Sequence, residues 1–343
     1  MKEVTQELVK WYQQNKRELP WRKDKNPYHV WISEIMLQQT RIEAVKNYYT
    51  RFMTSFPNIH ALATAKEEQV LKLWEGLGYY NRARNLQKAA QIIEEQYGGK
   101  FPTQYEEILS LPGIGEYTAG AIASICFNEK AVAVDGNVLR VYMRLTNCQD
   151  NVLDPKVKKR VSLELMKILP DDSGDFNEGL MELGEIICLP TTPLCEQCPI
   201  QRYCKAYQQQ TQTSLPTRIK KENKKEENLT VFLLYYQQKI ALSYRDQQTL
   251  LKNLWQFPNV EKTMDQEAIL SWLKMQNVEG NIQGKIQNRH VFTHKIWNMT
   301  GYLIAVDNMI TTYTWVSLEE AREKYTIPTA FQPFLNYLEE VIK

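Results

Sequence analysis

The chain has 343 residues, 43% apolar and 24% charged, the composition of an ordinary globular protein with room for two domains. Its 42 Lys and Arg residues nearly balance 40 Asp and Glu residues, so bulk charge does not indicate a nucleic-acid-binding protein. No run of 18 apolar residues is present, which excludes a transmembrane helix, and residues 1–19 lack the order of a signal peptide. We therefore expect a cytoplasmic monomer without membrane contact.

The first part of the chain, residues 1–207, is predicted to be mainly helical. Apolar residues recur there at helical spacing, and Pro and Gly clusters separate the periodic segments. The clearest such segments are 30–45, 70–73 and 86–93.

Residues 208–228 are polar and nearly free of apolar side chains, so they are predicted to be a linker. The linker carries Lys220, Lys221, Lys224 and Lys225, which alternate with acidic residues. This pattern favours a solvated tether over a phosphate-binding patch.

Beyond the linker, residues 229–343 are predicted to form a smaller α+β domain. Segments 230–236 and 239–245 have the composition of two strands joined by a short turn at Gln237 and Gln238, and 299–306 with 311–317 form a second expected pair. Helical patterns follow at 265–275, at 319–325 and near the C-terminus.

Four of the six cysteines lie close together in the sequence, with six, two and five residues between them: Cys188, Cys195, Cys198 and Cys204. In a reducing compartment, four soft ligands at such spacing indicate a metal site rather than disulfides. Zinc and an iron–sulfur cluster both accept four thiolates, and spacing alone slightly favours zinc. The other two, Cys126 and Cys148, are expected to be buried thiols.

A glycine hairpin at residues 111–122 is predicted to open into a helix. Gly113 and Gly115 permit backbone conformations and close approaches that other residues resist. The free N–H groups of the following helix favour a phosphate oxygen, although a single Gly-x-Gly is weak evidence.

Two carboxylates stand in settings that suit acid–base chemistry. Glu34 lies within an apolar helix, where periodicity alone favours a solvent-facing position. Burial would instead raise its pKa and suit a general acid, whereas Asp135, in a more polar segment, would stay ionised. Cleavage of an N-glycosidic bond requires two such carboxylates with opposed roles.

The first domain resembles the MutY family of adenine DNA glycosylases, within the endonuclease III superfamily of helix-hairpin-helix, iron–sulfur glycosylases. The resemblance covers residues 1–207 and is carried by PWR at 20–22, SEIMLQQT at 33–40, LWEGLGYYNRARNL at 73–86, LPGIGEYTAG at 111–120, VDGNVLRV at 134–141 and FNEGLMELGEIIC at 176–188. It implies a mainly α helix-hairpin-helix domain of a bacterial-type enzyme. It also implies that the four clustered cysteines hold a structural, redox-active 4Fe–4S cluster, with Arg202 and Lys205 near the DNA backbone.

The same resemblance implies a role for particular residues. Glu34 would protonate the adenine ring, Asp135 would stabilise the sugar cation, and Asn137 would help to hold the site. Tyr117 stands where lyase relatives carry a nucleophilic lysine, and here it would assist. The remaining implied residues are Trp21, Arg22, Glu178 and Met181 in the adenine pocket, and Gln39, Tyr79, Gly113 and Gly115 in contact with DNA. Without the resemblance, Tyr79 and Tyr80 would be interpreted as aromatic packing.

The second domain resembles the MutT-like (Nudix-like) C-terminal domain of the same family. Residues 250–261 carry this likeness, with Asn253 in place of the usual Gly, while 262–275 lack the Glu-rich magnesium box of a Nudix hydrolase. The family's 8-oxoguanine contact, Phe-Ser-His, corresponds to Phe292, Thr293 and His294. Taken alone, Phe292 and His294 would be core and surface residues of a strand.

The resulting prediction is a monofunctional adenine DNA glycosylase acting on duplex DNA that contains adenine opposite 8-oxoguanine or guanine. One rival is an endonuclease III-like glycosylase and lyase, which needs a lysine at position 117, where this chain has Tyr117. A second rival is a catalytically silent iron–sulfur DNA-binding module. The presence of both Glu34 and Asp135 argues against it.

Overall fold

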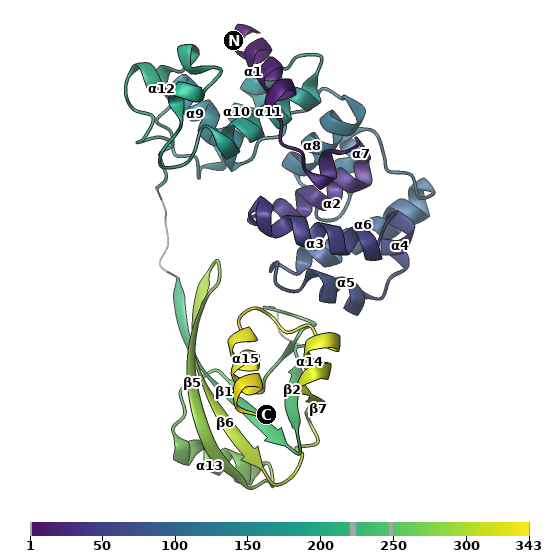
Figure 1. The fold of residues 1–343 in the computed structure, drawn as a ribbon, viewed down its shortest axis with the longest axis vertical. Helices are drawn as coiled ribbons and strands as arrows, with labels where there is room; N and C mark the ends of the chain where they lie inside the picture. The colour runs from purple at the N-terminus through teal and green to yellow at the C-terminus, as the bar shows by residue number, and fades with distance from the viewer. Residues whose placement is uncertain (1, 220–223, 247–249, 343) are drawn as a thin grey trace. The chain divides into compact units, whose positions relative to one another are not determined.

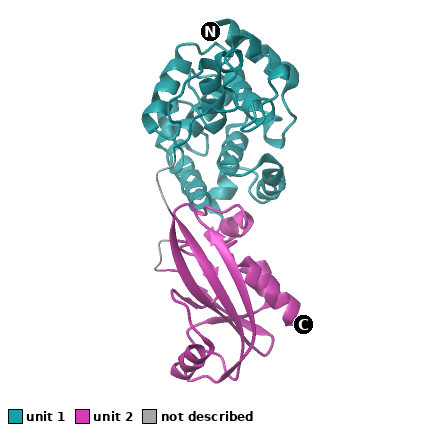
Figure 2. Ribbon diagram, turned by 90° about the vertical axis from the view of Figure 1, so that its left-hand side faces the viewer, with its two compact units in different colours: residues 1–65, 81–221 teal, residues 66–80, 222–343 magenta. Residues whose placement is uncertain are grey.

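A computed structural model of the chain describes residues 2–219, 224–246 and 250–342. The chain divides into two compact units, Met1–Ala65 with Asn81–Lys221 and Lys66–Tyr80 with Glu222–Lys343 (Figure 2). Within the described ranges, no helix has both the length and the apolar character needed to cross a bilayer.

The first unit is mainly α-helical, as the sequence predicts. Its elements, shown in Figure 1, are α1 (Lys2–Asn15), η1 (Pro20–Arg22), α2 (Pro27–Leu37), α3 (Ile42–Ser55), α4 (Ile59–Thr64), α6 (Asn81–Tyr97), α7 (Tyr105–Ser110), α8 (Glu116–Phe127), α9 (Gly136–Thr146), α10 (Pro155–Met166), α11 (Ser173–Ile186), η2 (Cys195–Gln197), η3 (Gln201–Tyr203) and α12 (Lys205–Gln208). The helices α1, α9, α10 and α11 share one buried apolar cluster.

The apolar segment 30–45 is not one helix, as its periodicity predicts, but parts of two. α2 ends at Leu37 and α3 begins at Ile42. Gln39 between them has φ +61°, in the left-handed region that a continuing right-handed helix does not contain. The segment contains neither Pro nor Gly, so periodicity gives no sign of this break.

α11 packs closely on its neighbours and so brings its polar side chains to fixed places. Phe176, Leu180 and Leu183 are each at most 4% exposed. Gly179 lies where a Cβ atom would come within 3.2 Å of Tyr12 on α1, and Gly184 lies where it would come within 2.6 Å of Asn137 on α9. Small residues at both contacts allow the helices to approach closely.

The second unit is a seven-stranded mixed sheet with helices. Its strand order is β3-β2-β1-β6-β5; β4 also pairs with β1, and β7 with β2. The β1–β6 pair is parallel. Its elements are α5 (Glu67–Trp74), β1 (Lys225–Tyr236), β2 (Lys239–Tyr244), β3 (Trp255–Gln256), β4 (Asn259–Val260), α13 (Gln266–Met275), β5 (Gly280–Val291), β6 (Lys295–Val306), β7 (Thr314–Ser317), α14 (Leu318–Lys324) and α15 (Gln332–Val341).

Helices cover both faces of this sheet (Figure 1). Along β1, Leu229, Val231 and Leu233 join the cluster that includes α14 and α15. Phe232 and Leu234, which point to the opposite face, join the cluster under α13. Two-residue alternation on a strand therefore supplies two apolar layers at once.

The strand pairings agree with the sequence prediction in one case and differ in another. β1 and β2 form the expected hairpin, with Gln237 and Gln238 at positive φ in its turn. The expected pairing of 299–306 with 311–317 is wrong, because β6 pairs with β1 and β5 while β7 pairs with β2. Periodicity identifies strands but does not fix their partners.

Part of the predicted linker packs against the helical unit. The Arg144 Nε atom donates to the Leu215 carbonyl at 3.0 Å, and the Val152 amide donates to the Thr217 carbonyl at 3.1 Å. At the other end, β1 begins at Lys225, so the last four residues of the predicted linker belong to the strand. Lys220 and Lys221 lie outside the described residues.

Candidate active site

Glu34 is buried, contrary to the solvent-facing position that periodicity favours. The Asn26 side chain caps α2 by accepting from the Tyr28 amide at 2.9 Å, and Pro27 occupies the first turn. Nearly every residue of α2 is buried, and Glu34 is only 7% exposed. Because α2 is covered on all sides, it has no solvent-exposed face, and the carboxyl group of Glu34 lies inside the protein.

The environment of Glu34 favours its protonated form. Burial raises the pKa of Glu34 to about 7, and the charge of Asp135 acts in the same direction. The Tyr117 hydroxyl donates to Glu34 Oε2 at 2.6 Å and opposes this rise. Glu34 is therefore close to half protonated near neutral pH, as a general acid requires.

Replacing Tyr117 with Phe should move the alkaline limb of the pH–rate profile to higher pH. A general acid works when protonated, so the wild-type rate should fall as pH rises through about 7, the pKa of Glu34. The lost phenol stabilises the ionised carboxylate, so the pKa of Glu34 rises in Tyr117→Phe. Single-turnover rates measured from pH 5.5 to 9 check this. Tyr236→Phe on β1 is the control, and superimposable limbs for Tyr117→Phe and wild type would refute the assignment.

Asp135 is held at the N-terminus of α9. Its side chain caps the helix by accepting from the Val138 amide at 2.7 Å, and it accepts from the Asn137 Nδ2 atom at 2.9 Å. Burial raises the pKa of Asp135, while these two donors and the charge of Arg140 oppose the rise. The helix dipole also favours a negative charge at this end.

Arg140 connects the Asp135 region to the first cysteine of the cysteine loop. Its Nη2 atom donates to Asn137 Oδ1 at 2.8 Å and to the Gly184 carbonyl at 2.7 Å, and its Nε atom donates to the Cys188 carbonyl at 2.7 Å. Asn137 in turn bonds Asp135. The orientation of the carboxylate thus depends on groups up to 53 residues away in the chain.

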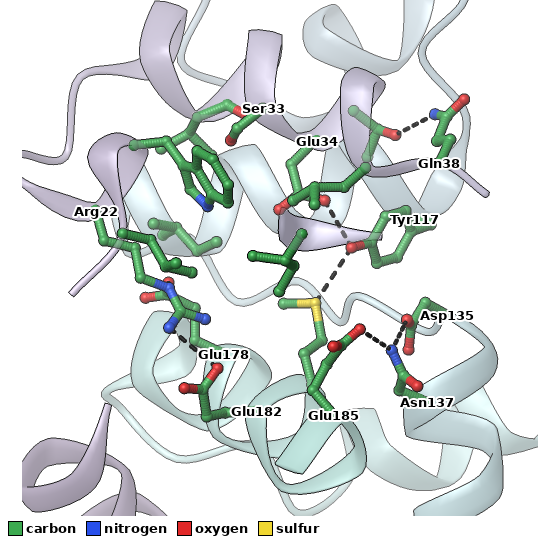
Figure 3. Close-up of a pocket in the computed structure, with 18 of the residues that line it drawn as sticks. Arg22, Ser33, Glu34, Gln38, Tyr117, Asp135, Asn137, Glu178, Glu182 and Glu185 are labelled. Carbon is green, nitrogen blue, oxygen red and sulfur yellow. Dashed lines mark hydrogen bonds and ion pairs between the residues drawn. The ribbon is translucent and has the colours of Figure 1, made fainter. Parts of the chain in front are cut away.

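Glu34 and Asp135 line one cavity of about 820 Å³ in the first unit (Figure 3). Most of the residues that the resemblance implies are brought together there: Trp21, Arg22, Gln39, Gly115, Tyr117, Asn137, Glu178 and Met181. Gly113 and Tyr79 are outside its lining. The cavity is therefore built from η1, α2, the glycine hairpin, α9 and α11.

The wall formed by α11 carries, beside the expected Glu178, two acids that the sequence analysis did not single out, Glu182 and Glu185. Glu178, Glu182 and Glu185 all line the cavity, at helical spacing i, i+4 and i+7. Arg22 Nε lies 3.1 Å from Glu178 Oε1, and burial raises the pKa of Glu178 against the opposing charge of Arg22. A signal for this wall was present in the sequence. The acids of segment 173–186 repeat at helical spacing among apolar residues, which predicts an acidic face on a packed helix.

The glycine hairpin has the geometry that its sequence predicts. Gly113 has φ +79°, and a Cβ atom there would lie 2.6 Å from the Asn85 Cβ atom. Both the left-handed backbone conformation and the lack of space therefore require glycine. Gly115 precedes α8 as its N-cap, and no atom lies within 4 Å of the place where its Cβ would be. The amides at the start of α8 are thus approachable by an anion.

Gln39 and Tyr79, the two residues expected to enter the duplex, both have left-handed backbone conformations. Gln39 has φ +61° in the turn after α2, and Tyr79 has φ +48° in the turn after α5. The Tyr79 side chain is 52% exposed. Non-glycine residues with positive φ are uncommon and often mark functional turns.

The four clustered cysteines line a second, smaller cavity in the first unit: Cys188, Cys195, Cys198 and Cys204. All four are free thiols. Burial raises the pKa of Cys198 to about 12, and the neighbouring cysteines act in the same direction. Among the residues described, no three or more His, Cys, Asp or Glu side chains are arranged so that they could together hold one metal ion. Four soft donors around one apolar cavity fit the chemistry of an iron–sulfur cluster.

The residues implied in reading 8-oxoguanine form the turn between β5 and β6. The Phe292 amide donates to the Lys295 carbonyl at 2.8 Å, so the segment is a hairpin turn rather than a strand. Phe292 packs on Trp297 with ring centroids 4.8 Å apart, while Thr293 and His294 are exposed. The Thr293 hydroxyl lies 2.8 Å from the Tyr79 hydroxyl within the same unit.

Comparison with known proteins defines the class first. Residues 32–171 match the HhH-GPD superfamily of base excision DNA repair proteins, and residues 230–337 match the NUDIX domain. The structure of a thermostable thymine-DNA glycosylase is similar, with 30% identity and a TM-score of 0.55 over 61% of this chain and 97% of that one. A trapped endonuclease III–DNA covalent intermediate is similar, with 27% identity and a TM-score of 0.52 over 61% and 95%.

The curated relatives identify the family. An adenine DNA glycosylase of Buchnera aphidicola subsp. Schizaphis graminum is 36% identical, over 88% of this chain and 86% of its own length. The human adenine DNA glycosylase is 44% identical, over 61% of this chain and 40% of its own length. The chain belongs to the adenine DNA glycosylase family, whose members hydrolyse N-glycosyl bonds in base excision repair.

Proposed function

We propose that the chain is a monofunctional glycosylase that releases adenine mispaired with 8-oxoguanine or guanine in duplex DNA. The observation that carries this proposal is a single cavity lined by two buried carboxyl groups that are held by different partners. Glu34 is buried in an apolar helix with its pKa raised to about 7, and Asp135 receives N–H donors at a helix N-terminus. This is the division of roles that glycosidic cleavage needs.

In the proposed mechanism, Glu34 gives its proton to a ring nitrogen of the flipped adenine. The bond between the sugar and the base breaks, and its electron pair leaves with the neutral base. The sugar becomes an oxocarbenium-like cation, which the carboxylate of Asp135 stabilises by charge. Water adds to the cation and loses a proton to the Glu34 carboxylate, which restores the acid. Tyr117 offers a phenol in place of an amine and forms no Schiff base with the opened sugar.

We propose that Phe292, Thr293 and His294 read the base opposite adenine. Adenine is the same base in both mispairs, so discrimination between 8-oxoguanine and guanine must come from contacts to the other strand. Thr293 and His294 are exposed at a hairpin tip, where a hydroxyl and an imidazole offer hydrogen bonds. Phe292 is anchored on Trp297, which fixes the turn.

The combined variant Thr293→Ala with His294→Ala tests this function. We expect wild type to release adenine opposite 8-oxoguanine faster than opposite guanine, and the variant to lose this preference by up to about 100-fold, because lost hydrogen bonds cost roughly 0.5–3 kcal/mol. Single-turnover rates on both duplexes and on one containing thymine glycol give the ratio. Thr312→Ala, at an exposed residue of the same unit, is the control. Equal losses on both adenine duplexes, or release of thymine glycol instead, would refute the proposal.

We also propose that the four cysteines of the second cavity hold a 4Fe–4S cluster. When bound, the cluster would stabilise the loop and supply a redox centre. Arg144 fixes the loop by donating to the Leu189 carbonyl at 2.7 Å and the Pro190 carbonyl at 2.8 Å. Two backbone carbonyls beside Cys188 are therefore hydrogen-bonded to a buried arginine, which fixes the start of the loop that carries the thiols.

Purified protein should contain about four irons per chain and show broad visible absorbance. Cys198→Ser should lose most of the iron and weaken DNA binding, because one thiolate ligand is missing. Cys148→Ser, outside the cavity lining, should keep wild-type iron content. Metal analysis checks both variants, and zinc without iron in the wild-type protein would contradict the assignment.

A further inference from the structure

The connection between α1 and α2 forms part of the cavity wall, and both ends of its segment 17–22 bind the same carboxylate. This segment carries Trp21 and Arg22, both in the cavity lining. Glu182 on α11 accepts from the Arg17 amide at 3.0 Å, Nε at 2.7 Å and Nη2 at 2.8 Å. It also accepts from Arg22 Nη1 at 3.0 Å. Glu182 thus binds both ends of segment 17–22.

The Glu182 carboxylate has no free acceptor site with which to bind a substrate. Its Oε1 atom accepts two donors from Arg17, and its Oε2 atom accepts one from Arg17 and one from Arg22. A carboxylate has roughly four acceptor sites, so all of them are used. The side chain is also 0% exposed. Any effect of Glu182 on a base in the cavity must therefore pass through Arg22 and segment 17–22.

Arg22 is fixed on three sides. Its Nη1 atom bonds Glu182, its Nε atom lies 3.1 Å from Glu178, and its guanidinium carbon lies 5.7 Å from the centre of the Tyr12 ring. Figure 3 shows Arg22 directed towards Glu178 and Glu182 at the edge of the cavity. Trp21 packs edge-on against Tyr49, with centroids 5.3 Å apart. A guanidinium with three partners has little rotational freedom.

We propose that Glu182 and Arg17 form a positioning pair that fixes Trp21 and Arg22 against the purine in the cavity. The pair sets the orientation of the base relative to Glu34, and this role rests on the function proposed above. Two arginines and two carboxylates, Arg17, Arg22, Glu178 and Glu182, together carry no net charge. Loss of one carboxylate would loosen segment 17–22 and leave a positive charge near a base that must itself gain a proton.

Glu182→Gln, of nearly unchanged shape, tests the pair. We expect adenine release under single turnover to slow by about tenfold or more, because charge-assisted hydrogen bonds are lost. Affinity for a duplex with a non-cleavable 2′-fluoroadenosine should weaken about tenfold. Affinity for a duplex with tetrahydrofuran, which lacks the base, should stay unchanged. Arg17→Lys keeps the charge but loses the two-pronged geometry and should show the same pattern to a smaller degree.

The controls separate positioning from folding and from the proposed function. Glu95→Gln, on the exposed side of α6, should behave as wild type. A merely structural pair would lower the active fraction while leaving the rate constant of the active molecules intact, which would overturn the proposal. Equal loss of affinity for both analogue duplexes would also overturn it. If Glu182→Gln does not fold, the same rate and affinity measurements on Arg17→Lys test the proposal. Wild-type protein that releases no adenine refutes the proposed function instead.

Discussion

Glu34→Gln should release adenine at least about 100-fold more slowly than wild type while still binding the mismatched duplex. The glutamine keeps the shape of the side chain and a hydrogen-bonding partner for Tyr117, but it has no proton to give. General acid catalysis typically contributes about 10²–10⁴-fold, which sets the expected loss. Binding should persist because we expect most duplex contacts to lie outside this buried carboxyl group. Single-turnover rates and a binding titration on one adenine:8-oxoguanine duplex measure both quantities.

The pH dependence adds a second check on Glu34. Wild-type activity should decline above about pH 7, the pKa of Glu34, whereas the residual activity of Glu34→Gln should not show this limb. Glu95→Gln on α6 makes the same chemical change at an exposed position and should leave rate and profile unaltered. A near-normal rate constant for Glu34→Gln would exclude Glu34 as the acid.

The sequence alone predicted the features that depend on residues close together in the chain, namely turns, strands and a helix cap. Gly113 and Gly115 predicted the hairpin, and two segments of strand-like composition joined by a short turn predicted β1 and β2. Asp265 begins a predicted helix and caps α13 by accepting from the Ala268 amide at 2.8 Å. Each of these features depends on residues only a few positions apart.

Features that depend on distant packing could not be predicted from the pattern. Glu34 is buried because α8 packs on α2, and the Tyr117 hydroxyl of α8 reaches Glu34 across 83 residues of the chain. Glu182 meets Arg17 across 165 residues, so neither residue indicated the other in the sequence. β5 was missed because it has few apolar residues. One face of the strand is half-buried and the other is exposed, so neither face needs the apolar side chains that mark a core strand.

Asp135→Asn should reduce adenine release by roughly 10²–10³-fold with little change in folding. Asparagine is about as good an N-cap as aspartate, so α9 should still begin at the same residue. The amide carries no negative charge, however, and the sugar cation loses the group that would stabilise it. Loss of one preorganised stabilising group in a buried site typically costs about 10²–10³ in rate. Thermal unfolding and single-turnover kinetics together measure the two effects.

The chain offers a matched control in Asp154, which caps α10 by accepting from the Lys156 amide at 2.9 Å and lies outside the cavity lining. Asp154→Asn makes the same substitution at the same kind of position, so it isolates the consequence of the cap itself. If both variants lose stability equally and activity only in that proportion, Asp135 serves as a cap and not as an electrostatic partner of the sugar. If only Asp135→Asn loses rate, the negative charge is required, because the cap is preserved in both.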